Sequence, residues 1–145
     1  MAADNFTQKE KELIKESIRN AERATSGEVQ VHIENHCSGE VLDRAAQIFK
    51  ILKMHKTDLR NGVLFYLAMK DHKFAILGDA GINAKVPTNF WDEIKSHMAE
   101  KFKKGQIAEG LAEGIKMAGI QLQHHFPVSK DDINELSDDI SFGKN

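Results

Sequence analysis

The sequence predicts a mixed α/β domain in which a small sheet lies between layers of helices. Residues 28–34 alternate between polar and apolar side chains, as a strand does. Residues 63–69 form a continuous apolar run, which is typical of a central strand covered on both faces. Amphipathic helical segments stand before, between and after these strands. The order helix, strand, helix, strand, strand, helix, helix therefore predicts a three-layer α/β/α sandwich with a small mixed central sheet.

The first expected element is a helix over residues 8–25. Thr7 and Glu10 have the spacing of a capping box, in which each side chain accepts a hydrogen bond from the other's backbone amide. Apolar residues follow at helical spacing, so one face of the helix is apolar. Ser26 and Gly27 end it.

Residues 28–34 are expected to form a half-buried strand. Val29, Val31 and Ile33 point one way, and the polar residues between them point the other way. A second helix is expected over residues 40–53, where apolar residues return at the helical period.

The second and third strands are expected at residues 63–69 and 73–77. The short polar turn between them predicts an antiparallel hairpin. A strand–helix–strand unit normally makes a right-handed crossover, so the first two strands should be parallel. The expected strand order is one, two, three, with the apolar strand central.

Two helices complete the domain. Pro87 and Thr88 are expected to open the first, which Gly105 ends, and the second runs over residues 107–125. Three glycines interrupt the second helix, and close packing against a neighbour is one explanation for them: Gly110, Gly114 and Gly119. The expected boundaries are 5–127 for the domain and 128–145 for an acidic C-terminal tail.

The composition limits the cellular compartment and the kinds of partner that we expect for this protein. The chain has 145 residues, a net charge of -2 and one cysteine, Cys37. Such a charge disfavours nucleic acid as a partner, and a protein partner remains open. No segment approaches the roughly 20 apolar residues of a membrane span, and the first residues lack the pattern of a signal peptide. The sequence therefore predicts a soluble, cytoplasmic protein.

The expected topology gathers oxygen-bearing side chains at one end of the sheet. The first and second strands begin there and the third ends there, which brings together Glu28, Asp58, Asn61 and Asp79. Calcium takes about six to eight oxygen ligands in irregular geometry, so this set is a candidate Ca²⁺ site, with another divalent cation as an alternative. An ordinary structural interpretation stays open, in which Glu28 caps a helix, Asp79 shapes its own turn and Asn61 supports a bend.

Four motifs along the chain resemble those of the TPM domain family. They are Thr-Ser-Gly-Glu-Val-Gln-Val at 25–31, Arg-Asn-Gly-Val-Leu at 60–64, a strand and glycine turn at 73–82, and Phe-Lys-Lys-Gly-Gln-Ile-Ala-Glu-Gly-Leu at 102–111. Together they cover the chain from about Asn5 to Phe126 in the expected order.

The resemblance implies a sheet sandwiched between helices and a divalent-cation site near the sheet end. Glu28, Asn61 and Asp79 stand on motif positions, whereas Asp58 is included on geometry alone. Arg60 stands where the family usually has aspartate. The family includes a plant thylakoid-lumen protein described as an acid phosphatase, so a metal-dependent acid phosphatase is an alternative function. A protein interaction module, recognised through the loop end or the acidic tail, is another.

The other chemical candidates are weaker. His32, His36 and Cys37 suggest a zinc set, but their spacing fits no common zinc motif, and a solvated strand face and loop is the favoured interpretation. Cys37 with a neighbouring histidine as base would be a nucleophile only if its pKa were lowered. Catalytic residues therefore remain unassigned.

Overall fold

The computed structural model describes residues 1–128 and 139–143. It contains a sheet with the strand order β3-β2-β1-β4. β1 (Glu28–Glu34) is parallel to β2 (Gly62–Ala68), which is antiparallel to β3 (Lys73–Gly78). The order and directions expected for these three strands are confirmed. A two-residue strand, β4 (Ser141–Phe142), is added in parallel on the other side of β1.

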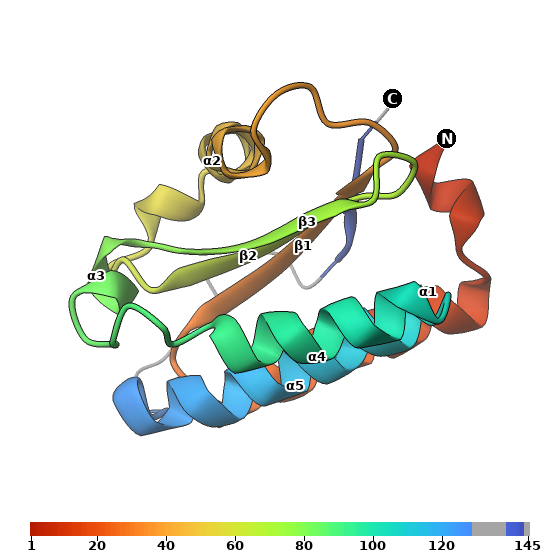
Figure 1. The fold of residues 1–145 in the computed structure, drawn as a ribbon. Helices are drawn as coiled ribbons and strands as arrows, with labels where there is room; N and C mark the ends of the chain where they lie inside the picture. Colours follow the sequence, from red (N-terminus) through yellow and green to blue (C-terminus); the bar gives the residue numbers. More distant parts are fainter. Residues whose placement is uncertain (129–138, 144–145) are drawn as a thin grey trace.

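Helices cover both faces of the sheet, which confirms the three-layer architecture (Figure 1). α2 (Val41–Ile51) lies on one face together with the short helix η2 (Met54–Lys56), whereas α1 (Gln8–Ala24), α4 (Asp92–Lys103) and α5 (Ile107–His125) lie on the other. α1 begins at the expected capping box, where Thr7 Oγ1 accepts from the Glu10 amide at 3.1 Å.

The segment between β3 and α4 differs from expectation. The helix expected to open at Pro87 begins only at Asp92. Separate turns precede it, because the Phe90 amide donates to Pro87 O and the Asp92 amide to Asn89 O, both at 3.1 Å. Three short helices were not predicted: η1 (Ala2–Asn5), η2 (Met54–Lys56) and α3 (Ala80–Asn83).

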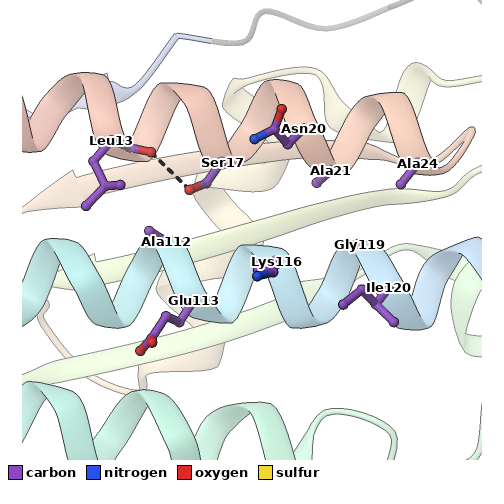
Figure 2. Close-up of a pocket in the computed structure, with 10 residues that line it drawn as sticks. All are labelled: Leu13, Ser17, Asn20, Ala21, Ala24, Ala112, Glu113, Lys116, Gly119 and Ile120. Atoms are coloured by element: carbon purple, nitrogen blue, oxygen red, sulfur yellow. Dashed lines mark hydrogen bonds between the residues drawn. The ribbon is translucent and has the colours of Figure 1, made fainter.

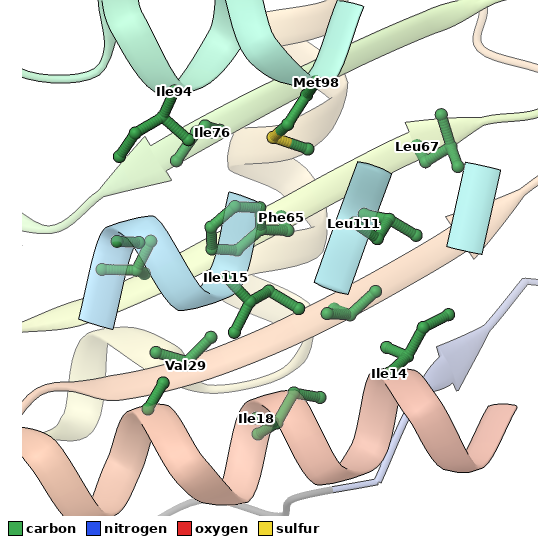
Figure 3. Close-up of a cluster of buried hydrophobic side chains, with 14 of the residues drawn as sticks. Ile14, Ile18, Val29, Phe65, Leu67, Ile76, Ile94, Met98, Leu111 and Ile115 are labelled. Carbon is green, nitrogen blue, oxygen red and sulfur yellow. The ribbon is translucent and has the colours of Figure 1, made fainter. Parts of the chain in front are cut away.

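The main core lies between the sheet and the three-helix layer. Figure 3 shows side chains of β1, β2 and β3 meeting those of α1, α4 and α5 in one apolar cluster. Its labelled members are Ile14, Ile18, Val29, Phe65, Leu67, Ile76, Ile94, Met98, Leu111 and Ile115. A second cluster under α2 includes Ala45, Ile48, Phe49, Leu64 and Tyr66.

The glycines of α5 let its neighbours approach, as expected. A Cβ on Gly114 would stand 2.5 Å from Met98 Sδ of α4, and one on Gly119 would stand 3.0 Å from Ala21 Cβ of α1. Figure 2 shows Ala21 and Gly119 facing each other across the α1–α5 contact. These side-chain-free positions set how closely the helices of this layer pack.

β1 is not half-buried, so that expectation was wrong. All seven of its residues are buried, including the four polar ones: Glu28, Gln30, His32 and Glu34. The polar side chains of β1 lie on the face of the sheet that α2 covers, and one of them forms an ion pair with this helix. The alternation of polar and apolar residues therefore marks two different buried faces rather than a buried and a solvated one.

Part of the segment expected to be a tail joins the sheet. Ser141 and Phe142 pair with β1, and Ile140 is 7% exposed. Residues 129–138 and 144–145, which the expected acidic tail also includes, lie outside the described residues. Of the helices in the described part of the chain, none has the length and apolar character needed to cross a membrane.

Candidate functional site

The starts of β1 and β2 and the end of β3 meet at one edge of the sheet. The Glu28 amide donates to Asn61 O at 3.2 Å, and the Asp79 amide donates to Gly62 O at 3.0 Å. Three of the four predicted ligand residues, Glu28, Asn61 and Asp79, are therefore held together through adjacent backbone segments. We call this region the loop edge and define it as residues 26–28, 57–62 and 78–82.

Gly81 allows the loops of this edge to touch. A Cβ at this position would stand 2.0 Å from Leu59 O and 2.7 Å from Arg60 O. The Gly81 amide instead donates to Arg60 O at 2.8 Å. Any side chain at this position would push α3 away from the loop before β2.

The carboxylate of Asp79 is engaged on both oxygens. Arg60 Nε donates to Oδ2 at 2.7 Å and Arg60 Nη2 to Oδ1 at 2.8 Å. Oδ1 also accepts from the Ala80 amide at 2.7 Å, so Asp79 caps α3. Hydrogen bonding to Asp79 and its negative charge raise the pKa of Arg60, so the guanidinium stays charged. Asp79 thus shapes its turn, as the structural interpretation expected, and is neutralised by a cation from its own chain.

Asn61 and Glu28 are buried beside this pair. Asn61 Nδ2 donates to Ser26 O at 3.3 Å, and the Asn61 amide donates to Thr57 Oγ1 at 3.3 Å. Asn61 therefore also supports the backbone bend. Glu28 is 3% exposed, so a carboxyl group is enclosed where β1 begins.

Asp58 also belongs to the loop edge but, unlike Glu28, Asn61 and Asp79, it is exposed. It lies in an exposed turn between η2 and β2. Over residues 1–128 and 139–143, no three or more His, Cys, Asp and Glu side chains form a group that could hold a metal ion. Glu28, Asp58 and Asp79 therefore do not converge as carboxylate ligands, and any cation here would rely on amide and backbone oxygens as well.

A buried polar network at the other end of β1 was not predicted from the sequence. Glu34 is 1% exposed, and both of its oxygens accept from Arg44 of α2, from Nε at 2.8 Å and from Nη2 at 2.9 Å. The Tyr66 hydroxyl also donates to Glu34. His32 Nε2 lies 3.4 Å from Glu34 Oε1, and the His32 ring is stacked on that of Tyr66.

The network strongly perturbs the pKa values of its members. Burial opposes ionisation of Glu34, but hydrogen bonds from Arg44 and Tyr66 outweigh it and lower the pKa of the Glu34 carboxyl to about 2. Burial, reinforced by the hydrogen bond to Glu34, raises the pKa of Tyr66. Burial also lowers the pKa of His32, against the pull of the neighbouring carboxylate. Glu34 and Arg44 are therefore a permanent ion pair that ties α2 to β1.

The zinc and thiol candidates do not come together. His32 belongs to this network, whereas His36 Nδ1 lies 3.1 Å from Asp71 Oδ1. Asp71 also accepts from the Cys37 amide at 2.7 Å, and Cys37 is buried. The expected solvated face was therefore wrong for His32 and Cys37. These contacts fix the loop after β1 to the β2–β3 turn.

A groove with a volume of about 380 Å³ runs between α1 and α5 (Figure 2). Small residues such as Ala112 and Gly119 form part of its lining, and Leu13 and Ile120 on it are exposed. Ser17 on α1 donates to Leu13 O at 3.0 Å, so its hydroxyl serves its own helix. Two further polar side chains line the groove, Glu113 and Lys116, and Glu113 Oε2 lies 3.0 Å from His97 Nε2 of α4.

Comparison with known proteins assigns the family. The TPM domain matches residues 2–121. The NMR structure of the BA42 protein from the psychrophilic bacterium Bizionia argentinensis is 46% identical over 95% of each chain, with a TM-score of 0.90. The solution structure of an N-terminal domain from P. gingivalis, 18% identical over 83% of this chain and 77% of that one, shares the fold with a TM-score of 0.65. No curated protein matches. The chain belongs to the TPM domain family.

Proposed function

We propose that the loop edge binds a divalent cation of the calcium type, with Glu28, Asn61 and Asp79 supplying side-chain oxygens. The observation that supports this most is the meeting of three strand ends around two buried carboxyl groups. Glu28 and Asp79 are 3% and 7% exposed, and their backbones are joined to residues 61 and 62 of β2. Buried carboxylates need a positive charge or hydrogen bonds close by, and Arg60 already supplies both to Asp79, so this edge is built to keep a cationic group beside Asp79.

Arg60 sets the strength of this binding. Its guanidinium already neutralises Asp79, so an incoming cation has to displace it. The Arg60 side chain is 50% exposed, and turning outwards would return its charge to water. The loop edge is thus a cation site with a built-in competitor, and weak, calcium-type affinity follows from that competition.

Calorimetric titration with calcium chloride tests the proposal. The wild-type chain should bind one calcium ion with a dissociation constant on the order of 0.1–1 mM, the range of weak extracellular-type sites. Asp79→Asn should weaken binding by about tenfold or more, since it removes a ligand charge. Asp92→Asn, in the exposed first turn of α4, is the matched control and should leave the affinity unchanged.

Equal calcium affinity in the wild type and Asp79→Asn would exclude Asp79 as a ligand. Magnesium, which demands nearly octahedral geometry, should compete poorly with calcium for irregular loop oxygens. Asp58, in its exposed turn, is the least supported member of the predicted set. We therefore expect Asp58→Asn to change the affinity less than Asp79→Asn does.

The phosphatase alternative has less support. Binding a phosphoryl group needs free cationic donors, and the guanidinium of the loop edge is engaged by Asp79. If the chain hydrolysed a chromogenic phosphomonoester and lost that activity in Asp79→Asn, the alternative would gain support. Activity that persisted in Asp79→Asn would place the chemistry elsewhere.

A further inference from the structure

A pocket separate from the α1–α5 groove opens where β2 turns into β3. Its volume is about 440 Å³, within the range of roughly 300–1,000 Å³ that is typical of small-molecule sites. Its walls come from β2, the β2–β3 turn, β3, the end of α4 and the start of α5. Figure 1 shows the β2–β3 turn and the C-terminal end of α4 at the same end of the molecule. We call this cavity the hairpin pocket and define it by five apolar lining residues, Leu67, Met69, Phe74, Phe102 and Ile107, and two basic ones, His72 and Lys103.

The walls of the hairpin pocket are apolar side chains that the protein leaves partly uncovered. Met69, Phe74, Phe102 and Ile107 pack against the main core cluster but are each partly exposed, whereas Leu67 is buried. The rings of Phe74 and Phe102 meet edge to face, with 5.0 Å between their centroids. An apolar ligand would remove this surface from water, which favours its binding.

Two glycines shape the pocket. A Cβ on Gly110 of α5 would stand 2.7 Å from Cε1 of Phe102, so this glycine lets the Phe102 ring lie against α5. Gly105 lines the pocket and follows α4 with φ 76°. Among the described residues, no atom comes within 4 Å of a Cβ built at Gly105, so the rim is open there. A ligand can therefore enter without ordering a loop first, which lowers the cost of binding.

The polar lining of the pocket is basic. Its lining residues include Lys103 and His72 and no acidic side chain. Within the described part of the chain, neither of these two side chains forms an ion pair or a hydrogen bond. Asp71, the acidic neighbour of His72, is committed elsewhere, because its carboxylate accepts from the Cys37 amide at 2.7 Å and lies 3.1 Å from His36 Nδ1. The positive charge at the pocket is therefore available to a ligand.

His72 has a backbone conformation that is unusual for a residue with a side chain. Its φ of 54° lies in the left-handed region, which few residues other than glycine adopt. The turn that contains it is firmly held, since β2 and β3 pair up to Ala68 and Lys73. Such conformations concentrate at sites that bind ligands. The turn thus keeps the His72 ring at the pocket, at a cost in backbone strain.

We propose that the hairpin pocket binds a small organic monoanion with an apolar body, of the medium-chain carboxylate class. The apolar body lies against the rings of Phe74 and Phe102, and the carboxylate accepts from Lys103 and His72. One ammonium group balances one negative charge, so a monoanion fits this lining better than a doubly charged phosphate does. No residue of the pocket belongs to the loop edge, so this proposal is independent of the calcium site.

Fluorescence titration of the full chain with 8-anilinonaphthalene-1-sulfonate, an apolar monoanion, tests the proposal. Its emission should rise on binding to the wild type, and octanoate should displace it with a dissociation constant on the order of 0.1–1 mM. Octanol and octyltrimethylammonium have the same chain length without the negative charge. Both should displace the dye at least about tenfold more weakly, because neither can pair with Lys103.

Three variants assign the binding to the pocket. Lys103→Met keeps an unbranched apolar side chain and removes the charge, so it should weaken octanoate binding by about tenfold. Lys50→Met, at an exposed position of α2 on the other face of the sheet, is the matched control and should bind as the wild type does. Ala99→Phe would place a ring in the pocket and should abolish displacement of the dye by octanoate.

Equal affinities for octanoate and octanol, or equal octanoate affinities in Lys103→Met and Lys50→Met, would overturn the proposal. A wild type that leaves the dye emission unchanged would overturn it as well. If Ala99→Phe failed to fold, amide NMR of the wild type provides the second measurement. Octanoate at about 1 mM should shift signals of residues 67–74 and 99–107. Shifts confined to residues 13–24 and 112–120 would place the anion in the α1–α5 groove and reject the hairpin pocket.

Discussion

Arg60 holds the carboxylate of Asp79 through two hydrogen bonds, of 2.7 and 2.8 Å, at the edge where three strand ends meet. Asp79 is buried, whereas half of the Arg60 side chain is exposed. The pair therefore has a fixed acidic partner and a basic partner that can leave. Cation binding at the loop edge should depend on Arg60 as much as on the ligands themselves.

Arg60→Asp should increase calcium affinity. The change removes the competing cation and adds a carboxylate beside Asp79, so we expect the dissociation constant to fall by about tenfold or more. Arg60 has φ 51°, a left-handed conformation that Asp adopts more readily than most residues, which favours an intact fold. Isothermal titration calorimetry measures the effect.

Arg23→Asp on α1 is the charge-matched control for this variant. Arg23 is exposed, and within the described residues its contacts are with Asn20 and Glu16 of its own helix. The Arg23→Asp variant changes the net charge by the same amount without altering a loop-edge residue, so its calcium affinity should match that of the wild type. An equal gain in both variants would mean that net charge alone, and not the site, controls binding.

Arg44→Met should destabilise the fold. The variant leaves the Glu34 carboxylate buried against α2 without its cation, and removing one partner of a buried pair costs about 3 kcal/mol or more. Urea unfolding followed by circular dichroism measures this loss. Arg23→Met, at an exposed position, should change the free energy of unfolding by less than about 0.5 kcal/mol. Similar small effects in both variants would show that the ion pair adds no stability.

Stability should decrease on acidification through Glu34. Its pKa is about 2 in the folded chain and near 4.5 when unperturbed, so between these values the unfolded chain binds more protons. The stabilisation is complete above about pH 4.5 and is lost as the pH falls towards 2. Because the pKa of His32 is lowered in the folded chain, His32 also makes the fold less stable as the pH falls just below 6.5, its ordinary pKa.

Urea unfolding at several pH values between 7 and 2 measures this dependence. The double variant Glu34→Gln, Arg44→Met removes the perturbed carboxyl group together with its partner, so its free energy of unfolding should fall less steeply below about pH 4.5. An unchanged slope would assign the acid sensitivity to other carboxylates.

Gly119→Ala should destabilise the α1–α5 contact even though Ala is the better helix former. The added methyl group would stand 3.0 Å from Ala21 Cβ and 3.1 Å from Ala21 Cα, so the backbone of α1 must move. Overpacking of this kind costs about 1–3 kcal/mol, against a propensity gain of about 1 kcal/mol. Thermal or urea unfolding should show a net loss.

Gly114→Ala is the contrasting variant. Its methyl group would meet the side chain of Met98, which can change rotamer, so the loss of stability should be smaller. A Gly119→Ala variant that is more stable than the wild type would show that α1 can shift at little cost.

The order and directions of β1, β2 and β3, and therefore the position of the loop edge, could be predicted because strand directions follow from connection rules. Parallel β1 and β2 and the returning β3 place residues 28, 61 and 79 together whatever their side chains do. The pairing of Arg60 with Asp79 was not predicted. Side-chain pairing across two loops depends on rotamers that periodicity does not encode.

The buried network at the end of β1 was missed for a different reason. Polar residues that alternate with apolar ones indicate a solvated face, and Glu34 fits that pattern. The signal that could have corrected this is Arg44, a cation on the amphipathic helix that follows. β4 was missed because acidic residues dominate the composition around it, although Ile140 and Phe142 alternate with Ser141 as in a strand.

Amide NMR of the wild-type chain during calcium titration tests the central claim most directly. The account predicts that calcium at millimolar concentrations shifts the signals of residues 26–28, 57–62 and 78–82, and leaves those of 31–34 in place. If calcium shifts no signals in these three segments, or shifts those of acidic residues on the helices instead, the result would contradict a cation site at the loop edge.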